Sequence, residues 1–410
     1  MSLAFGRALH SVPGPSVFPD RVLRAMHRPA PNIYEGELID LTARIKSDLQ
    51  SVAVTTGEAL IYIANGHGGW EAALSNIVEP GDKLLFLVTG RFALGWGEVA
   101  ERLGAEVELL DYGTAAAVDP QQLEDRLRAD KDGEIRAVLV CQTDTASSVR
   151  NDVAAIRAAM DAVRHPALLC VDCIASLACE PYEMDAWGVD ITVAGCQKGL
   201  MTPPGLAFNF ISEKAWEARQ RVTRTSAYWD WTMRRDPEIF YMNFFGTAPT
   251  NHLFGLGTAL DILLREEGLS NTYARHQALA KAVWAAVDAW AEGGPLTPNI
   301  ADKSIRSWGM TAIWSGAADA DGLRDWCEKQ AGLTLGIGLS LAANKNEPTQ
   351  GLFRIGHMGH LSPPMVLGAL ATVDAGLKTL GIAHGAGALE AASASIASHF
   401  TAAGALQKST

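Results

Sequence analysis

The sequence lacks any long apolar stretch. No apolar run reaches roughly 18 residues anywhere in the chain, although a membrane-spanning helix needs about 20. The first residues carry neither a long apolar core nor a cleavage pattern, so they do not indicate a secretory signal. These features exclude the membrane-spanning class, and we expect a cytoplasmic protein with no membrane partner.

Positive charge is also scarce. The chain has 34 Lys and Arg against 46 Asp and Glu, which gives a formal net charge of −12 at pH 7. Nucleic acids and anionic membranes attract basic proteins. The charge therefore argues against nucleic acid as a partner.

Cysteine is sparse, and it does not form a metal-binding pattern. Cys170 and Cys173 make a C-x-x-C among six cysteines in all, but no second pair with zinc-ligand spacing follows. Buried free thiols in a reducing compartment are the better interpretation. His357 and His360 form an H-x-x-H without a companion carboxylate, so we predict no metal site.

What the chain does have is length and an α/β pattern. Its 410 residues exceed the roughly 250 to 300 at which one hydrophobic core stops growing, so a large and a smaller domain are expected. Strand-like and helix-like segments alternate through residues 83–163, which predicts a mostly parallel sheet flanked by helices, with the site at the strand ends. Earlier and later segments follow the same periodicity rules. Further helices are predicted at 37–53, 70–77, 249–265, 271–292, 323–329 and 363–380, and further strands at 60–64, 310–314 and 351–355.

Lys198 is the first candidate functional residue. A β-rich run at residues 191–194 breaks at Gly195 and leads to Lys198, in a turn closed by Pro203-Pro204-Gly205. Burial between two strands would lower the pKa of the lysine and make its amine nucleophilic. The alternative is a solvated surface lysine, which is what most lysines are.

Asp172 is the second candidate. It ends an apolar run at residues 167–172, which reads as a buried strand. An acid and a lysine at the ends of two buried strands are typical of a pyridoxal phosphate site, where the acid keeps the pyridine nitrogen protonated and the lysine forms the Schiff base. The alternative is an ordinary helix cap.

A glycine-rich segment provides a candidate phosphate site. Asn65-Gly66-His67-Gly68-Gly69 follows a short apolar run and precedes the predicted helix at 70–77. Such a turn presents free backbone N–H groups and the positive end of the helix dipole to an anion.

Seven short motifs in order along the chain resemble one family. The family is that of the class V aminotransferases of fold type I, and within it the alanine/serine/aspartate:glyoxylate group. The motifs are Pro13-Gly14-Pro15-Ser16, Gly66-His67, Val171-Asp172, Gln197-Lys198-Gly199, Pro203-Pro204-Gly205, Thr247-Ala248-Pro249 and Arg354-Ile355-Gly356.

The resemblance implies pyridoxal 5'-phosphate as cofactor and a role for each matching residue. Lys198 would be the catalytic lysine and Asp172 the acid at the pyridine nitrogen. Arg354 would bind the substrate α-carboxylate, unless it forms a structural ion pair. The remaining implied cofactor contacts are Gly66, His67 and Gln197 at the phosphate, Thr145 at the 3-hydroxyl side, Phe92 stacked on the ring, Ile174 on its other face, and Thr247 from the partner subunit. Phe92 could instead be an ordinary core aromatic.

The resemblance also implies the architecture. We expect the pyridoxal phosphate-dependent transferase fold type I, an α/β fold, with an N-terminal arm (1–20), a large cofactor-binding domain (21–268), a small C-terminal α+β domain (269–385) and a C-terminal tail (386–410). A homodimer or a dimer of dimers is expected, in which the arm runs across the partner subunit and lines the substrate entrance; the alternative for the arm is a disordered tail. Residues 384–410 are Ala/Ser/Gly-rich, which indicates a loosely held helix or a tail.

Two departures from the family pattern affect the expected site. Phe244 stands where the family has a tyrosine, which removes one phosphate hydrogen bond. Cys196 replaces a serine before the catalytic lysine, a near-isosteric change that gives up a strong hydrogen bond.

The expected activity is transamination from serine, alanine or aspartate to glyoxylate or pyruvate. One alternative is a pyridoxamine-pyruvate aminotransferase, which shares Arg-Ile-Gly-His-Met-Gly with residues 354–359 but has glutamate where this chain has His67. A second is a lyase acting on a β-substituted amino acid with the same cofactor. A third is a non-catalytic vitamin-binding protein.

Overall fold

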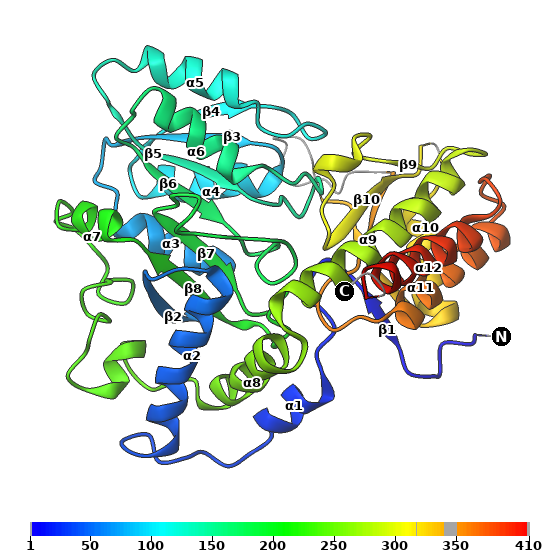
Figure 1. The fold of residues 1–410 in the computed structure, drawn as a ribbon, viewed down its shortest axis with the longest axis horizontal. Coiled ribbons are helices and arrows are strands. Elements are labelled where there is room, and N and C mark those ends of the chain that lie inside the picture. The colour runs from blue at the N-terminus through cyan, green and yellow to red at the C-terminus, as the bar shows by residue number, and fades with distance from the viewer. Residues whose placement is uncertain (1, 317, 340–350, 408–410) are drawn as a thin grey trace.

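The computed structural model describes residues 2–316, 318–339 and 351–407. Its strands form two separate sheets, of seven and five strands. Figure 1 shows the two sheets side by side, each with helices packed against it. Residue 1 of the predicted arm, residues 317 and 340–350 of the predicted small domain, and residues 408–410 of the predicted tail lie outside the described residues.

The seven-stranded sheet confirms the predicted, mostly parallel architecture. The strand order is β2-β8-β7-β6-β5-β3-β4, in which β7 to β4 run parallel and β8 is antiparallel to both of its neighbours. Every residue of β6 and β7 is buried, as is typical of central parallel strands covered on both faces. The strands are β2 (Glu58–Ala64), β3 (Lys83–Val88), β4 (Glu106–Asp111), β5 (Ile135–Cys141), β6 (Leu168–Asp172), β7 (Ile191–Gly195) and β8 (Gly205–Ile211).

Helices cover both faces of this sheet. Because side chains alternate along a strand, Leu84 and Phe86 of β3 pack on one face, while Leu85 and Leu87 pack on the other. The first face carries α3 (Gly66–Ser75), α4 (Arg91–Arg102) and α7 (Glu213–Arg219). The second carries α2 (Glu37–Ala53), α5 (Pro120–Ala129), α6 (Val153–Ala162) and α8 (Thr250–Asp261).

The five-stranded sheet belongs to the C-terminal part of the chain, except for its first strand. The order is β1-β11-β12-β10-β9, with β1 parallel to β11 and the other neighbours antiparallel. Its strands are β1 (Leu9–Ser11), β9 (Thr297–Pro298), β10 (Met310–Trp314), β11 (Leu333–Ile337) and β12 (Leu352–Gly356). They share one hydrophobic core with α9 (Leu269–Ala291), α10 (Ala320–Ala331), α11 (Pro363–Thr379) and α12 (Ala388–Gln407).

The N-terminal arm connects the two sheets within one chain. After β1, the Ser11 hydroxyl donates to the Gly356 carbonyl (3.0 Å), and the Ser16 hydroxyl donates to the Lys198 carbonyl (2.7 Å). The chain then enters α1 (Asp20–Met26). Figure 1 shows the arm, in blue, beginning beside the C-terminal helices and returning toward the large sheet. The arm is therefore ordered on its own chain.

One predicted helix boundary changes. The helix expected at 70–77 begins at Gly66, so the prediction of a turn before it was wrong: the Asn65 side chain accepts from Gly68 N (3.3 Å) and caps the helix. A Cβ on Gly69 would lie 2.8 Å from Val193 Cγ1, so glycine allows α3 to pack closely on β7.

The Ala/Ser/Gly-rich segment from residue 384 was expected to be a loosely held helix or a tail. It contains α12, with Ala388 and Ala392 buried in the C-terminal core.

No helix among the described residues has both the length and the apolar character needed to cross a membrane. The described residues also contain no group of three or more His, Cys, Asp or Glu side chains that could hold a metal ion.

We predict that all six cysteines are unreactive in the folded protein. Each is free and buried, and burial raises the thiol pKa, to about 12 for Cys179 and Cys327 and about 11 for Cys196. Because the thiolate is the reactive form, a disulfide reagent such as Ellman's reagent at pH 8 should label no thiol quickly in the folded protein and all six after denaturation. Rapid labelling of one thiol in the folded state would contradict this.

Candidate active site

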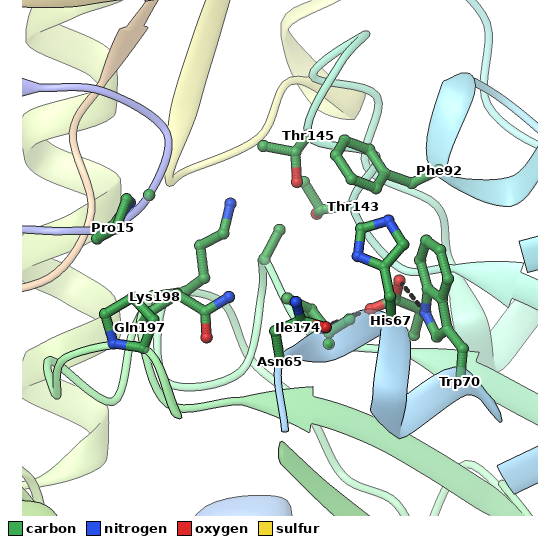
Figure 2. Close-up of a pocket in the computed structure, with 15 residues that line it drawn as sticks. Pro15, Asn65, His67, Trp70, Phe92, Thr143, Thr145, Ile174, Gln197 and Lys198 are labelled. Carbon is green, nitrogen blue, oxygen red and sulfur yellow. Dashed lines mark hydrogen bonds between the residues drawn. The ribbon is translucent and has the colours of Figure 1, made fainter. Parts of the chain in front are cut away.

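A cavity of about 250 Å³ lies at the carboxyl ends of the central strands. β6 ends on Asp172 and its parallel neighbour β7 leads to Lys198, so both side chains reach the same edge of the sheet. Figure 2 shows Lys198 on one side of this space and His67 and Phe92 on the other. The lining residues are Gly14, Pro15, Asn65, Gly66, His67, Trp70, Phe92, Thr143, Thr145, Asp172, Ile174, Ala175, Gln197, Lys198 and Pro204.

Lys198 is buried, with 8% of its surface exposed, so it is not a solvated surface lysine. Burial, and then the nearby Arg354, lower the pKa of its amine to about 7, against the opposing effect of Asp172. Its Nζ donates to the Pro13 carbonyl of the arm. Glycine is required beside it, because Gly14 has φ of +100° and a Cβ there would lie 2.5 Å from Lys198 Cε. A large fraction of this amine is therefore uncharged and nucleophilic near neutral pH.

Asp172 is buried beneath the same cavity and accepts hydrogen bonds on both oxygens. Ile174 N donates to Oδ1 (2.6 Å) and the Trp70 indole donates to Oδ2 (2.9 Å). Burial nevertheless raises the pKa of this carboxyl to about 7. A cationic ring nitrogen is the kind of partner that would stabilise the ionised carboxylate here.

This shift predicts a stability effect in the cofactor-free protein. Because the folded-state pKa of Asp172 lies above its ordinary value of 3.8, the stability it contributes is lost as the pH rises through about 7. Asp172→Asn stays neutral, so its stability relative to wild type should be more favourable at pH 8 than at pH 5, by on the order of 2 kcal/mol. Thermal unfolding of both proteins at the two pH values measures this, and an equal difference at both would contradict it.

The N-terminus of α3 provides an anion site at the floor of the cavity. Asn65 caps the helix, and the two amides that follow, those of Gly66 and His67, have no carbonyl of a preceding helical turn to bind. Gln197 lines the same space, where the N–H groups of its side-chain amide could donate to an anion. A Cβ on Gly66 would lie 2.3 Å from Ile174 Cδ1, so a larger residue there would require the Ile174 side chain to shift.

Aromatic rings form one wall of the cavity. Phe92 lies 6.2 Å from Trp70 and 6.4 Å from His67, measured between ring centroids. Burial, followed by the nearby Arg91, lowers the pKa of His67, so its ring is neutral at pH 7. Ile174 lines the same cavity. A flat heteroaromatic ring would fit between these side chains.

Arg354 lies at the edge of the site, next to Thr145, without lining the cavity itself. It lies in the middle of β12, where its Nη1 donates to the Thr145 carbonyl (2.7 Å) and its Nε to the Ile337 carbonyl (2.7 Å). It is 6% exposed, burial lowers its pKa to about 10, and no ion pair involves it among the described residues. The structural ion pair considered as the alternative is thus not observed in the described part of the chain.

Thr247 lies apart from the cavity. It is exposed and follows a short 3₁₀ helix, η1 (Phe240–Phe244). Phe244 is buried at 1% exposure, whereas Tyr241 is 37% exposed. Within one chain, Thr247 contributes nothing to the site.

Some lining residues had not been predicted. Trp70 and Thr143 contribute to the cavity, whereas Asn65, Gly14 and Pro15 lie in the glycine-rich segment and the arm, which were expected there from the sequence. Trp70 could have been noticed because it lies three residues after His67, which places both on one face of a helix. The arm residues carried no signal beyond the matching Pro13-Gly14-Pro15-Ser16 motif.

The residues present fit pyridoxal phosphate. A lysine with a lowered pKa, a buried carboxylate and two free helix N-terminal amides together match an aldehyde, a pyridine nitrogen and a phosphate.

Comparisons with known proteins agree with this geometry. The family model described as aminotransferase class-V matches residues 23–311. The serine–glyoxylate aminotransferase of Methylorubrum extorquens is 36% identical over 92% of each chain. Among solved structures, the ureidoglycine-glyoxylate aminotransferase of Bacillus subtilis has a TM-score of 0.84 at 26% identity, covering 96% of this chain and 99% of that one. The pyridoxamine-pyruvate aminotransferase of Mesorhizobium loti has a TM-score of 0.84 at 28% identity, covering 97% and 100%.

Proposed function

The chain belongs to the class V aminotransferase family, and on this premise we propose that it transfers the amino group of serine, alanine or aspartate to glyoxylate or pyruvate, with pyridoxal phosphate carried on Lys198. The observation that carries the proposal is the pair of buried groups at the ends of β6 and β7, Asp172 and Lys198, which face one cavity.

The cofactor would be held at each end. Asp172 would bind its ring nitrogen, the amides of Gly66 and His67 and the side chain of Gln197 its phosphate, and Thr145 its 3-hydroxyl side. Phe92 and Ile174 would enclose the ring. When bound, the cofactor supplies an electron sink that stabilises negative charge at the substrate Cα.

Lys198 would act twice. Its amine would hold the cofactor, since an uncharged amine is nucleophilic toward an aldehyde. When free, Nζ can accept the proton from the substrate Cα and donate it at the C4′ atom of the cofactor, because a pKa of about 7 lets one group serve as base and acid near neutral pH.

Arg354 would bind the carboxylate of both substrates. Its guanidinium already uses Nε and one Nη1 hydrogen bond on backbone carbonyls, which fixes the plane of the group. The remaining N–H donors can bind a carboxylate at this buried position.

We further propose a homodimer, or a dimer of dimers, in which Thr247 completes the partner's phosphate site. Apolar side chains are exposed on β2 and on the loop that precedes Thr247, including Ile63 (43% exposed), Ile239 (51%) and Met233 (41%). Burial of these side chains against a second copy would be favourable. The domain division predicted from the sequence remains a proposal, as does a cytoplasmic location, which the six free cysteines support.

A second candidate is a pyridoxamine-pyruvate aminotransferase. The solved enzyme with that activity has the same fold over nearly the whole chain, and Arg-Ile-Gly-His-Met-Gly at 354–359 matches it. His67 stands against this candidate, since that enzyme has glutamate at the corresponding position.

The test is the visible spectrum of the cofactor-loaded protein after adding L-serine, L-alanine, L-aspartate or ureidoglycine without a keto acid. Bleaching by one donor, with one equivalent of keto acid and no ammonia, supports transamination and identifies the donor. Ammonia release would indicate a lyase. Conversion of free pyridoxamine by pyruvate, with no response to any amino acid, would favour the second candidate.

A further inference from the structure

Trp70 connects three parts of the site. It lies on α3, is 1% exposed, and its ring stacks on Trp96 at 5.9 Å with an interplanar angle of 16°. The same ring contacts His67 at 4.5 Å and meets Phe92 edge-on at 6.2 Å. Figure 2 shows it beside His67, with a hydrogen bond leading away from the indole.

That hydrogen bond goes to Asp172. The indole Nε1 donates to Oδ2 at 2.9 Å, while the only other side-chain contact on this oxygen in the described part of the chain is the weak donor Cys141 Sγ at 3.7 Å. An indole N–H can only donate. It therefore favours the ionised carboxylate over the protonated acid.

We propose that Trp70 is a positioning residue for the reaction, whose indole N–H keeps the Asp172 carboxylate ionised and oriented toward the pyridine nitrogen of the cofactor. The proposal rests on the proposed function. Its consequence is chemical: with Asp172 ionised, the proton between carboxylate and ring stays on the ring nitrogen, where its charge is needed for electron withdrawal.

The surroundings of Asp172 leave this role to Trp70. The titratable groups that face the carboxylate are Asp144, Cys141, Cys173 and Lys198. Asp144 opposes ionisation of Asp172, and burial keeps both thiols neutral. Once Lys198 is attached to the cofactor, it no longer offers a free ammonium. The backbone N–H of Ile174 remains, but it binds the other oxygen, Oδ1.

Trp96 provides a matched control. It is also fully buried and stacks on Trp70, but its Nε1 has no hydrogen-bond partner among the described residues. Trp70→Phe and Trp96→Phe therefore make the same change in side-chain size within one stacked pair. Only the first removes a hydrogen bond to Asp172.

The experiment measures the dissociation constants of two ligands by equilibrium dialysis with wild type and both variants. The ligands are pyridoxal phosphate and its analogue with carbon in place of the ring nitrogen. We expect Trp70→Phe to weaken the binding of pyridoxal phosphate about 10-fold or more, as for the loss of a hydrogen bond to a charged group. The dissociation constant of the carbon analogue should stay within about 3-fold of its wild-type value. Trp96→Phe should leave both within about 3-fold.

Three outcomes would overturn the inference. The first is that Trp70→Phe binds pyridoxal phosphate as tightly as wild type. The second is that Trp70→Phe loses the same affinity for both ligands, and the third is that Trp96→Phe loses as much affinity for pyridoxal phosphate as Trp70→Phe does. The second and third would indicate a packing role only. If Trp70→Phe does not fold, Trp70→His, whose ring can still donate, takes its place and should retain the preference for pyridoxal phosphate over the carbon analogue. A wild type that binds no pyridoxal phosphate would instead refute the proposed function.

Discussion

Replacing Lys198 by alanine should abolish transamination, with a loss in kcat of about 1000-fold or more, and should remove the visible absorbance of the cofactor-loaded protein. The substitution deletes the amine that would carry the cofactor and the base that would move the Cα proton. Lys198→Arg should be as inactive, since a guanidinium keeps its positive charge and cannot act as a base near neutral pH. Absorbance spectra and single-turnover kinetics measure both effects.

Lys214→Ala is the matched control for this prediction. Lys214 pairs with Asp190 at 3.4 Å, its side chain is 44% exposed, and it lies outside the cavity. Activity within about two-fold of wild type is expected, as for a surface substitution. A coloured and active Lys198→Ala protein would show that another amine carries the cofactor.

The sequence was most informative where chemistry and periodicity coincide. The alternation of strands and helices over residues 83–163 was sufficient to predict the parallel sheet, because parallel strands need crossover connections. α2 occupies the predicted range, since its apolar residues recur at helical spacing. Lys198 and Asp172 were found because each is a polar residue that follows an apolar run. Burial of such a group costs free energy unless it has a partner, so its presence there indicates a function.

Contacts between distant segments were not predictable in the same way. The start of α3 was missed because glycine is a poor helix former, and only packing against β7 explains Gly69 there. The hydrogen bond from Trp70 to Asp172 joins residues 102 positions apart. No local pattern specifies such a contact, although it bears directly on the carboxylate that the sequence did identify.

The N-terminal arm shows the same limit. Its prolines predicted an extended segment, and it is extended, yet its pairing with β11 joins Leu9 to Leu333. A Cβ on Gly356 would lie 2.1 Å from the Val12 carbonyl oxygen, so the arm can pack here only against glycine. From the sequence, Gly356 was noted only as part of the motif that contains Arg354. Whether the arm also meets a partner subunit remains a prediction.

Arg354→Gln should lower kcat/KM by about 100-fold or more for both the amino acid and the keto acid, because both carboxylates would use this guanidinium. Arg354→Lys should recover part of the loss by keeping a positive charge without the planar pair of donors. Steady-state kinetics with each substrate varied in turn measures this. A loss confined to one substrate would refute the shared carboxylate site.

Stability distinguishes this loss from misfolding. Arg354 is a buried cation without an ion pair among the described residues, and burial lowers its pKa to about 10, so its charge costs folding free energy until a carboxylate binds. The cofactor-free Arg354→Gln variant should therefore unfold at the same temperature as wild type or a higher one, while its activity collapses. Arg324→Gln, which removes a nearby cation that pairs with Asp321 at 2.6 Å, should leave kcat/KM within about three-fold, as expected of a substitution outside the site. An Arg354→Gln protein that unfolds at a lower temperature would mean that the guanidinium stabilises the junction through its bonds to the Thr145 and Ile337 carbonyls, and its carboxylate-binding role would then rest on the kinetics of Arg354→Lys.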